Sequence, residues 1–358
     1  MKKSIGWGFG RCNMGCRHCY AASGNACPQY VLKRLGKIAD KICPEADAIN
    51  YGTGEFVFNM SAFMLARYIT ERYPHVAQSV TTNGATVMII KELWGTEALK
   101  KNFHDIDFSI DFPDPERHNA FRQHPYAWDW VIKGLEICQK EGIEASVVTC
   151  VTGLTTNDDI LGLLDIAQKY GASWRANWYR PTGRGKKDRK LNLRPARVWN
   201  VLKLLSERTK IEALSDPLFD AVLGAGYNSY NGCACGENSC RIQTDLSVTP
   251  CVFLGGKEWN GGFINRRSLD QIFESRVFKK FRARSPVFCQ GCEFWEKCRG
   301  GCASRAVLYR GGLNEPDGFC PIVNGLDVEE VRDMRIKILG GQEKKVHDGY
   351  LCTLIVKP

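Results

Sequence analysis

Three cysteines near the start of the chain have the spacing of a metal-binding loop. Cys12, Cys16 and Cys19 form the pattern C-x3-C-x2-C. Three thiolates this close together can bind three corners of a 4Fe-4S cube and leave the fourth iron open to a small ligand. Zinc is the alternative, but it requires a fourth protein ligand, and only His18 or Cys27 is nearby in the sequence. The spacing therefore favours an iron-sulfur cluster with one open coordination site.

A second group of cysteines lies in the C-terminal part of the chain. Nine of the 17 cysteines fall between positions 233 and 320. In a reducing compartment, such a density indicates metal binding rather than disulfide bonds. A zinc ribbon is again the alternative. We therefore expect further metal centres in this region.

The overall composition is that of a folded protein of about two domains. The chain has 358 residues, of which 44% are hydrophobic. It contains no run of about 20 apolar residues that would cross a membrane. The N-terminal sequence MKKSIGWGFGRC reaches Gly and Arg too early for a signal peptide. We therefore expect a cytoplasmic protein with no membrane partner.

The net charge of +10 would ordinarily suggest a nucleic-acid partner. That charge counts every cysteine as neutral. If eleven cysteines are thiolates on three clusters, each with a core charge of about +2, roughly half of the positive excess disappears. A nucleic-acid partner is therefore not expected.

Short apolar runs alternate with longer segments of helical period, which predicts repeated βα units. The predicted strands are 4–10, 47–51, 77–82, 106–110, 145–151 and 173–180, and the predicted helices are 30–40, 60–73, 90–101, 128–141, 155–170 and 196–208. Parallel strands with right-handed crossovers would curl into a partial (β/α)6 TIM-type barrel, an α/β fold. Its functional groups would lie on the loops after the strands, and the first cysteine motif falls on such a loop.

The sequence also predicts where one part of the chain gives way to the next. Residues 1–190 would form the barrel, and 191–227 a covering helix and linker. Long periodic runs then give way to Gly, Asn and Cys, which predicts a metal-stabilised domain over 228–325. Residues 326–358 would add a helix, about 327–339, and an apolar tail, 350–356.

Several motifs resemble those of the radical S-adenosylmethionine superfamily. Residues 51–55, Tyr-Gly-Thr-Gly-Glu, look like the Gly-Gly-Glu motif of that family, with Thr53 in place of the first glycine. Residues 81–84, Thr-Thr-Asn-Gly, resemble its Thr-Asn-Gly turn, and 109–111, Ser-Ile-Asp, its Ser-Leu-Asp-Gly stretch. Residues 181–185 resemble a recurrent loop of these enzymes. The resemblance covers about residues 4–185.

This resemblance implies a set of residues around S-adenosylmethionine. Glu55 and the neighbouring backbone would hold the amino group of its methionine part. The alternation of the sixth strand would turn Arg175 inward, where it could pair with the cofactor's carboxylate. The residues expected to bind the cofactor are His18, Tyr20, Gly52, Gly54, Glu55, Asn83, Ser109, Ser146 and Arg175.

Strand alternation predicts which side chains face the inside of the barrel. Residues 174, 176 and 178 would face helices, while Arg175, Asn177 and Tyr179 would line the lumen, where Tyr179 could reach substrate. Ser146 and Cys150 would share the inner face of the preceding strand, with Cys150 either a hydrogen-atom donor or simple core. The residues expected to bind an acidic or carboxylate-bearing substrate are His118, Arg122, Arg180 and Arg184.

The second cysteine group resembles the SPASM extension of peptide-modifying radical enzymes. Carried over by position, the resemblance implies two auxiliary 4Fe-4S clusters with interlocking ligand sets. Cluster I would use Cys235, Cys240, Cys251 and Cys302, and cluster II would use Cys289, Cys292, Cys298 and Cys320. Cys233 could replace Cys235 as a ligand or be a spare thiol.

The resemblance implies reductive cleavage of S-adenosylmethionine to a 5'-deoxyadenosyl radical, which abstracts a hydrogen atom from substrate. A flavodoxin or ferredoxin would supply the electron. The substrate implied first is a ribosomal peptide. The alternative is an oxidase, epimerase or decarboxylase of a sugar, aminocyclitol, nucleoside or porphyrin. An electron carrier or zinc scaffold is a third class, against which the cofactor motifs argue.

Two further expectations concern substrate. Val252 and Phe253 follow Cys251, where anaerobic sulfatase maturases place an Asp base, so formylglycine formation is not expected. Only about ten residues precede Cys12, so we expect no separate leader-binding domain before the barrel.

Overall fold

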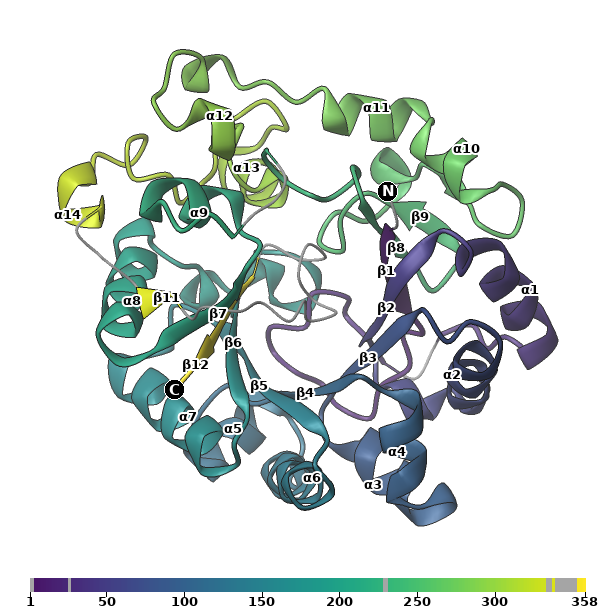
Figure 1. The fold of residues 1–358 in the computed structure, drawn as a ribbon. Helices are drawn as coiled ribbons and strands as arrows, with labels where there is room; N and C mark the ends of the chain where they lie inside the picture. Colours follow the sequence, from purple (N-terminus) through teal and green to yellow (C-terminus); the bar gives the residue numbers. More distant parts are fainter. Residues whose placement is uncertain (1–2, 25–26, 228–230, 333–336, 339–352) are drawn as a thin grey trace.

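Six parallel strands form the centre of the computed structural model, which describes residues 3–24, 27–227, 231–332, 337–338 and 353–358. They lie side by side in chain order. The strands are β1 (Lys3–Gly8), β2 (Ala46–Thr53), β3 (Ala77–Thr82), β4 (Asp105–Ser109), β5 (Glu144–Val151) and β6 (Ser173–Trp178). The sheet curls around an interior and its helices lie outside (Figure 1). The partial six-stranded barrel predicted from the sequence is therefore confirmed.

The covering helices follow the strands in the expected alternation. They are α1 (Leu32–Ile42), α2 (Met60–Arg72), α3 (Ala85–Trp94), α4 (Thr96–Asn102), α5 (Pro115–Arg122), α6 (Ala127–Glu141), α7 (Asn157–Lys169) and α8 (Pro195–Arg208). The predicted helix 90–101 is two helices, because Gly95 has a φ of +79° and ends α3. Helix α5, which begins with an Asp114 cap and a proline, was not predicted.

The alternation predicted for the sixth strand is confirmed. Trp174, Ala176 and Trp178 belong to the buried apolar core between the sheet and its helices. Arg175 and Asn177 point the other way and line the interior of the barrel. Strand β6 therefore separates the core from the functional interior.

The cysteine-rich region continues the same sheet. It contains β8 (Ser239–Ile242), β9 (Ser247–Thr249), β10 (Gly262–Phe263), α10 (Leu269–Phe273), α11 (Arg276–Arg282), α12 (Trp295–Cys298) and α13 (Ala303–Arg310). Strand β8 pairs in parallel with β1, and β9 and β10 extend the sheet antiparallel. Backbone hydrogen bonds thus join this region to the first barrel strand (Figure 1).

The other edge of the sheet is built from later parts of the chain. It contains β7 (Lys210–Leu214), α9 (Pro217–Leu223), α14 (Val328–Arg332), β11 (Lys337–Ile338) and β12 (Leu354–Lys357). Strand β12 lies antiparallel between β6 and β7. Residues 191–227 therefore hold a strand and a second helix besides the predicted covering helix.

The predicted helix 327–339 is wrong in its last part. Helix α14 covers 328–332, and residues 337–338 form a strand beside β7. The other positions of that prediction after 332, and positions 350–352 of the predicted tail, lie outside the described residues. Five short 3-10 helices complete the described chain: Phe56–Phe58, Gly183–Lys187, Arg189–Leu191, Lys257–Trp259 and Val287–Cys289. Over the described residues, no helix is long and apolar enough to span a membrane.

Candidate functional site

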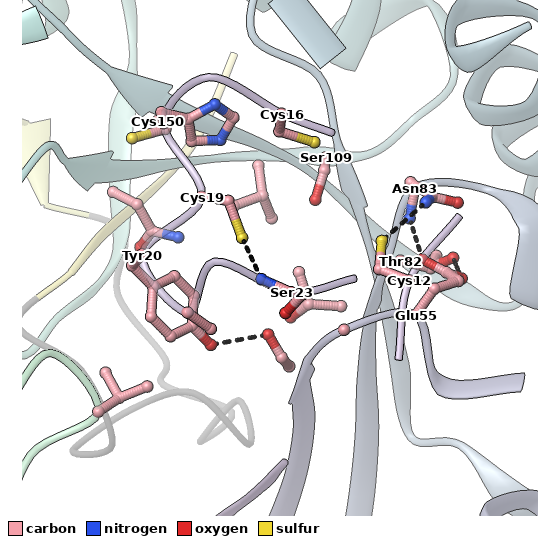
Figure 2. Close-up of a pocket in the computed structure, with 18 of the residues that line it drawn as sticks. Cys12, Cys16, Cys19, Tyr20, Ser23, Glu55, Thr82, Asn83, Ser109 and Cys150 are labelled. Carbon is pink, nitrogen blue, oxygen red and sulfur yellow. Dashed lines mark hydrogen bonds between the residues drawn. The ribbon is translucent and has the colours of Figure 1, made fainter. Parts of the chain in front are cut away.

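The first cysteine motif lies at the carboxyl ends of the barrel strands and faces a cavity. Cys12, Cys16 and Cys19 line this cavity, which encloses about 150 Å³, roughly ten times the space needed by one water molecule. Met14 and Trp130 pack around the three thiols. Figure 2 shows the thiols around one space. Among the described residues, no three His, Cys, Asp or Glu side chains form a group suited to a single metal ion.

The loop that carries these cysteines is held by arginines from later elements. Arg184 donates hydrogen bonds to the carbonyl oxygens of Cys16 at 2.8 Å and Ser23 at 2.6 Å. Gly183 has a φ of +60° and lies so close to the loop that a Cβ there would be 2.2 Å from the Cys19 oxygen. The resemblance of residues 181–185 therefore reflects contact with the cysteine loop. Arg184 does not line the cavity, which corrects its predicted role as a substrate contact.

Arg122 also holds this loop. Its Nε donates to Asp111 Oδ2 at 2.7 Å, and a terminal nitrogen lies 3.9 Å from Cys16 Sγ. The buried Asp111 carboxylate raises the pKa of Arg122 although burial opposes it. Arg122 lines the cavity as predicted, but its charge is already paired with Asp111. A dominant role in binding a substrate carboxylate is therefore not supported.

Glu55 connects the exit of β2 to the start of α3. Its Oε1 accepts hydrogen bonds from both the amide and the hydroxyl of Thr86 and from the hydroxyl of Thr82. Its Oε2 accepts one from the Asn83 amide at 2.8 Å. Burial raises the pKa of Glu55, and these hydrogen bonds oppose that shift. The carboxylate therefore orients the walls of the cavity, which it also lines (Figure 2).

Most residues predicted to bind the cofactor line the cavity. The group consists of His18, Tyr20, Gly52, Gly54, Glu55, Asn83, Ser109 and Arg175. Gly54 has a φ of +78°, and a Cβ there would lie 2.4 Å from the Arg11 oxygen, which explains the second glycine of the motif. His18 stacks on Phe121, and burial lowers its pKa to about 4, so the imidazole is neutral near pH 7.

Ser146 and His118 do not line the cavity, which corrects two predictions. Ser146 is on the same face of β5 as Cys150 but four residues nearer its start, whereas the cavity lies at the carboxyl ends of the strands. His118 is fully buried in α5, where its Nδ1 accepts a hydrogen bond from the Asp111 amide at 3.2 Å. His118 therefore positions Asp111, and through it Arg122.

Arg175 has a buried partner that the sequence reading missed. Its guanidinium forms an ion pair with Asp107 on β4, and its Nε donates to Thr353 Oγ1 at 3.2 Å. Asp107 and Ser109 alternate on β4, so the period-two pattern that placed Ser109 also places Asp107. Arg175 lines the cavity as predicted, and its charge is paired with Asp107 within the protein.

Cys150 and Tyr179, the two predicted catalytic residues, both line the cavity. Burial raises the pKa of the Cys150 thiol far above its usual value, so the thiol keeps its proton near pH 7. The Tyr179 side chain is 1% exposed, and its hydroxyl has no hydrogen-bond partner within the described part of the chain. A thiol hydrogen and an unpaired phenol thus share the wall formed by β5 and β6.

Four cysteines predicted for auxiliary cluster II surround a second cavity. They are Cys289, Cys292, Cys298 and Cys320. Asp317 also lines this cavity, and its Oδ2 accepts a hydrogen bond from the Cys302 amide at 2.7 Å. Asp317 thus links Cys302, predicted for cluster I, to the cavity that the four cluster II cysteines line.

The cysteines predicted for auxiliary cluster I do not all lie in one apolar cluster. The thiols of Cys233 and Cys251 contact that of Cys235, and these contacts together with burial raise the pKa of Cys235. Cys240, in contrast, packs in the main apolar core, and its strand neighbour is Ile5 of β1. Because β8 alternates, Arg241 faces the barrel interior near Gly8 and Cys240 faces away.

Successive side chains of a strand face opposite sides of the sheet. The spacing of the cysteines alone therefore did not show which side of β8 Cys240 faces. Cys233 therefore lies in one group with Cys235 and Cys251, and Cys240 lies outside that group. Cys302 is buried beside Ala303, which belongs to the same apolar cluster. The structure thus brings both Cys233 and Cys235 to this site rather than one of them.

Two family models match parts of the chain. The model of the Radical SAM superfamily matches residues 8–167, and that of SPASM, an iron-sulfur cluster-binding domain, matches residues 233–299. The chain is 25% identical over 367 aligned positions to the mycofactocin maturase MftC of Mycolicibacterium smegmatis, covering 97% of this chain and 90% of that protein. It is 24% identical over 340 positions to the AdoMet-dependent heme synthase of Methanosarcina barkeri, covering 86% and 93%.

Solved structures share the fold. The structure of anSMEcpe with bound AdoMet superposes with a TM-score of 0.71 at 18% identity, covering 93% of this chain and 98% of that one. Streptococcus suis SuiB bound to its precursor peptide SuiA gives a TM-score of 0.66 at 16% identity, covering 89% and 76%. A partial parallel barrel with a three-cysteine loop at its mouth and a cysteine-rich extension defines an iron-sulfur enzyme. The chain therefore carries a domain of the Radical SAM superfamily followed by a SPASM domain.

Proposed function

We propose that the chain modifies a ribosomally made peptide, using S-adenosylmethionine and three 4Fe-4S clusters. The relatives support a peptide substrate: besides the mycofactocin maturase, the chain is 27% identical over 322 positions to AlbA of Bacillus subtilis, a subtilosin biosynthesis protein, covering 85% and 66%. The observation that carries the proposal is the cavity that joins Cys12, Cys16 and Cys19 to the Gly-x-Gly-Glu segment.

The residues around this cavity fit the proposed cofactors. Three thiols from one loop would hold the first cluster, and Gly52, Gly54 and Glu55 line the same cavity. When bound, the cluster supplies one electron that cleaves S-adenosylmethionine to a 5'-deoxyadenosyl radical, which removes a hydrogen atom from substrate. Tyr20 orients the rim, because its hydroxyl donates to the Gly52 oxygen at 2.8 Å.

The second cysteine group supports two auxiliary clusters. We assign Cys233, Cys235, Cys251 and Cys302 to cluster I, and Cys289, Cys292, Cys298 and Cys320 to cluster II. Eight thiolates close both clusters and suit electron transfer rather than substrate binding. A flavodoxin or ferredoxin is the proposed reductant.

Cys150 and Tyr179 are the proposed catalytic residues. A buried, protonated thiol on the cavity wall can give a hydrogen atom to a substrate radical. The unpaired Tyr179 hydroxyl can donate a hydrogen bond to substrate. The alternative for Cys150 is a thiol that only fills the barrel interior. A Cys150→Ala variant that keeps full product yield and normal stereochemistry would support this alternative.

A small-molecule reaction is the second candidate function, because the AdoMet-dependent heme synthases of Methanosarcina barkeri and Nitratidesulfovibrio vulgaris are each 24% identical to this chain. Anaerobic enzyme with S-adenosylmethionine and reductant would be given, in separate reactions, any short peptide found encoded beside its gene and a tetrapyrrole carboxylic acid. A changed peptide mass with 5'-deoxyadenosine supports the peptide function. Decarboxylation of the tetrapyrrole supports the alternative, and the Cys12→Ala variant is the control for both reactions.

A further inference from the structure

Arg180 connects the cavity to the cysteine-rich region. It follows β6, and its side chain is buried. Its Nε donates to Ser304 Oγ at 2.8 Å, and one terminal nitrogen donates to the Trp178 oxygen at 2.9 Å. The other terminal nitrogen lies 3.3 Å from Cys302 Sγ and donates to it. These contacts use three of the five N–H donors of the guanidinium and hold it against the cysteine-rich region.

The guanidinium is held from a second side by an aromatic ring. Its central carbon lies 4.2 Å from the centroid of Phe253, two residues after Cys251. Phe253 and Arg180 both line the cavity that contains the first cysteine motif. Ser304 Oγ also lies 3.2 Å from Cys302 Sγ, so two polar side chains contact the same sulfur.

We propose that Arg180 sets the reduction potential of auxiliary cluster I by donating a hydrogen bond to Cys302. This inference rests on the proposed ligand set. Hydrogen bonds and positive charge at a cluster thiolate stabilise the more negatively charged reduced state, and they therefore raise the potential. The raised potential would make this cluster a better acceptor of one electron from any donor that reaches it.

Arg122 provides a counterpart at the first cluster. It lines the same cavity, and its terminal nitrogen lies 3.9 Å from Cys16 Sγ. Each arginine therefore contacts one sulfur, and the two sulfurs belong to different proposed clusters. Because the Arg180 contact is 0.6 Å shorter, its effect on potential is the larger of the two.

Potentials of the reconstituted holoenzyme can be measured by redox titration followed by electron paramagnetic resonance. Arg180→Gln is expected to lower the potential of one auxiliary cluster and to leave that of the first cluster unchanged. Arg122→Gln is the matched control, with the opposite pattern. Arg180→Lys keeps the charge but loses the planar fork, so it is expected to lie between Arg180→Gln and wild type.

Iron content distinguishes tuning from misfolding. Arg180→Gln is expected to bind as much iron as wild type. If Arg180→Gln binds less iron, Ser304→Ala is the test variant instead, because it removes only the hydroxyl contact to Cys302. Ser304→Ala is expected to lower the same auxiliary potential, by less than Arg180→Gln. An unchanged auxiliary potential in Arg180→Gln, or in Ser304→Ala where that variant decides, overturns the inference alone. A wild-type enzyme without auxiliary-cluster signals would instead overturn the ligand set and the proposed function with it.

Discussion

The ring of Phe253 lies edge-on to that of Tyr20, with the two centroids 5.4 Å apart. Tyr20 directly follows the third cysteine of the first motif, and Phe253 lies two residues after Cys251. The loop for the first cluster and the cysteine-rich region therefore meet through these two rings at the cavity.

Val252 and the ring of Phe253 occupy the positions where a sulfatase maturase would carry its Asp base after the corresponding cysteine. We predict that the enzyme forms no formylglycine on a Cys or Ser peptide, because Val252 and Phe253 cannot take the proton from the substrate radical. Mass spectrometry of a sulfatase-type peptide after turnover tests this. Formylglycine at a yield matching 5'-deoxyadenosine would contradict it.

Iron content tests the first motif. Anaerobically reconstituted wild-type enzyme is expected to hold about 12 iron and 12 sulfide per chain. Replacing Cys12, Cys16 and Cys19 with Ala is expected to leave about eight iron and to abolish 5'-deoxyadenosine formation. Stoichiometric zinc without iron in the wild-type protein would exclude the iron-sulfur interpretation.

Cys233 and Cys240 of the SPASM region give a matched pair of variants. Cys233→Ala is expected to lose about four of the 12 iron, since Cys233 contacts the proposed cluster I group. Cys240→Ala is expected to keep about 12 iron, because Cys240 packs in the apolar core beside Ile5. The opposite pattern of iron loss would restore the assignment based on spacing.

Arg184→Ala should impair cofactor cleavage and substrate turnover in equal measure. The reason is that Arg184 donates to two carbonyl oxygens of the first cysteine loop, at Cys16 and Ser23, and does not line the cavity. Lys186→Ala, exposed on the same short helix, is the control. A selective loss of substrate binding in Arg184→Ala would return this residue to the substrate site.

The lowered pKa of His118 makes the stability of the fold depend on pH. Burial lowers its pKa in the folded state to about 3, against 6.5 for an exposed imidazole. Between these two pKa values the unfolded chain binds a proton at His118 and the folded chain does not. The free energy of unfolding therefore falls as the pH drops from about 6.5 toward 3. At pH 5.5 the expected loss is about 1.4 kcal/mol relative to neutral pH.

His118→Asn is expected to remove this part of the pH dependence, because the amide oxygen can still accept from the Asp111 amide but does not titrate. Urea unfolding midpoints of both proteins between pH 7.5 and 5.5 give the comparison. Parallel pH curves for the two proteins would show that His118 does not contribute.

The barrel could be predicted from sequence because its strands and helices carry strong local patterns. Residues 77–82 form a strand with the predicted bounds, and the alternation at Trp174 and Arg175 gave the correct faces. The cavity was predictable where each motif directly follows a strand. Ser146 was misplaced because alternation gives the face of a strand but not the height along it.

Other features depended on contacts between distant parts of the chain. The position of Cys240 depends on the pairing of β8 with β1, and the partner of Arg175 on contact between β4 and β6. The arginine residues were predicted as free cations because their charge is visible in a sequence, whereas the buried acceptors that neutralise it are not. Asp111 and Cys302 are such acceptors.

The position of β12 sets an order for synthesis on the ribosome. Thr353 directly precedes this strand, bonds to Arg175 and to the Ala176 oxygen, and so connects to β6 over a sequence separation of 177 residues. Strand β6 therefore lacks β12 as its neighbour until residues 354–357 have been synthesised and have left the exit tunnel. Until that moment the edge of β6 offers unpaired backbone groups to other chains, so nascent chains that still lack β12 are the ones most in need of chaperones.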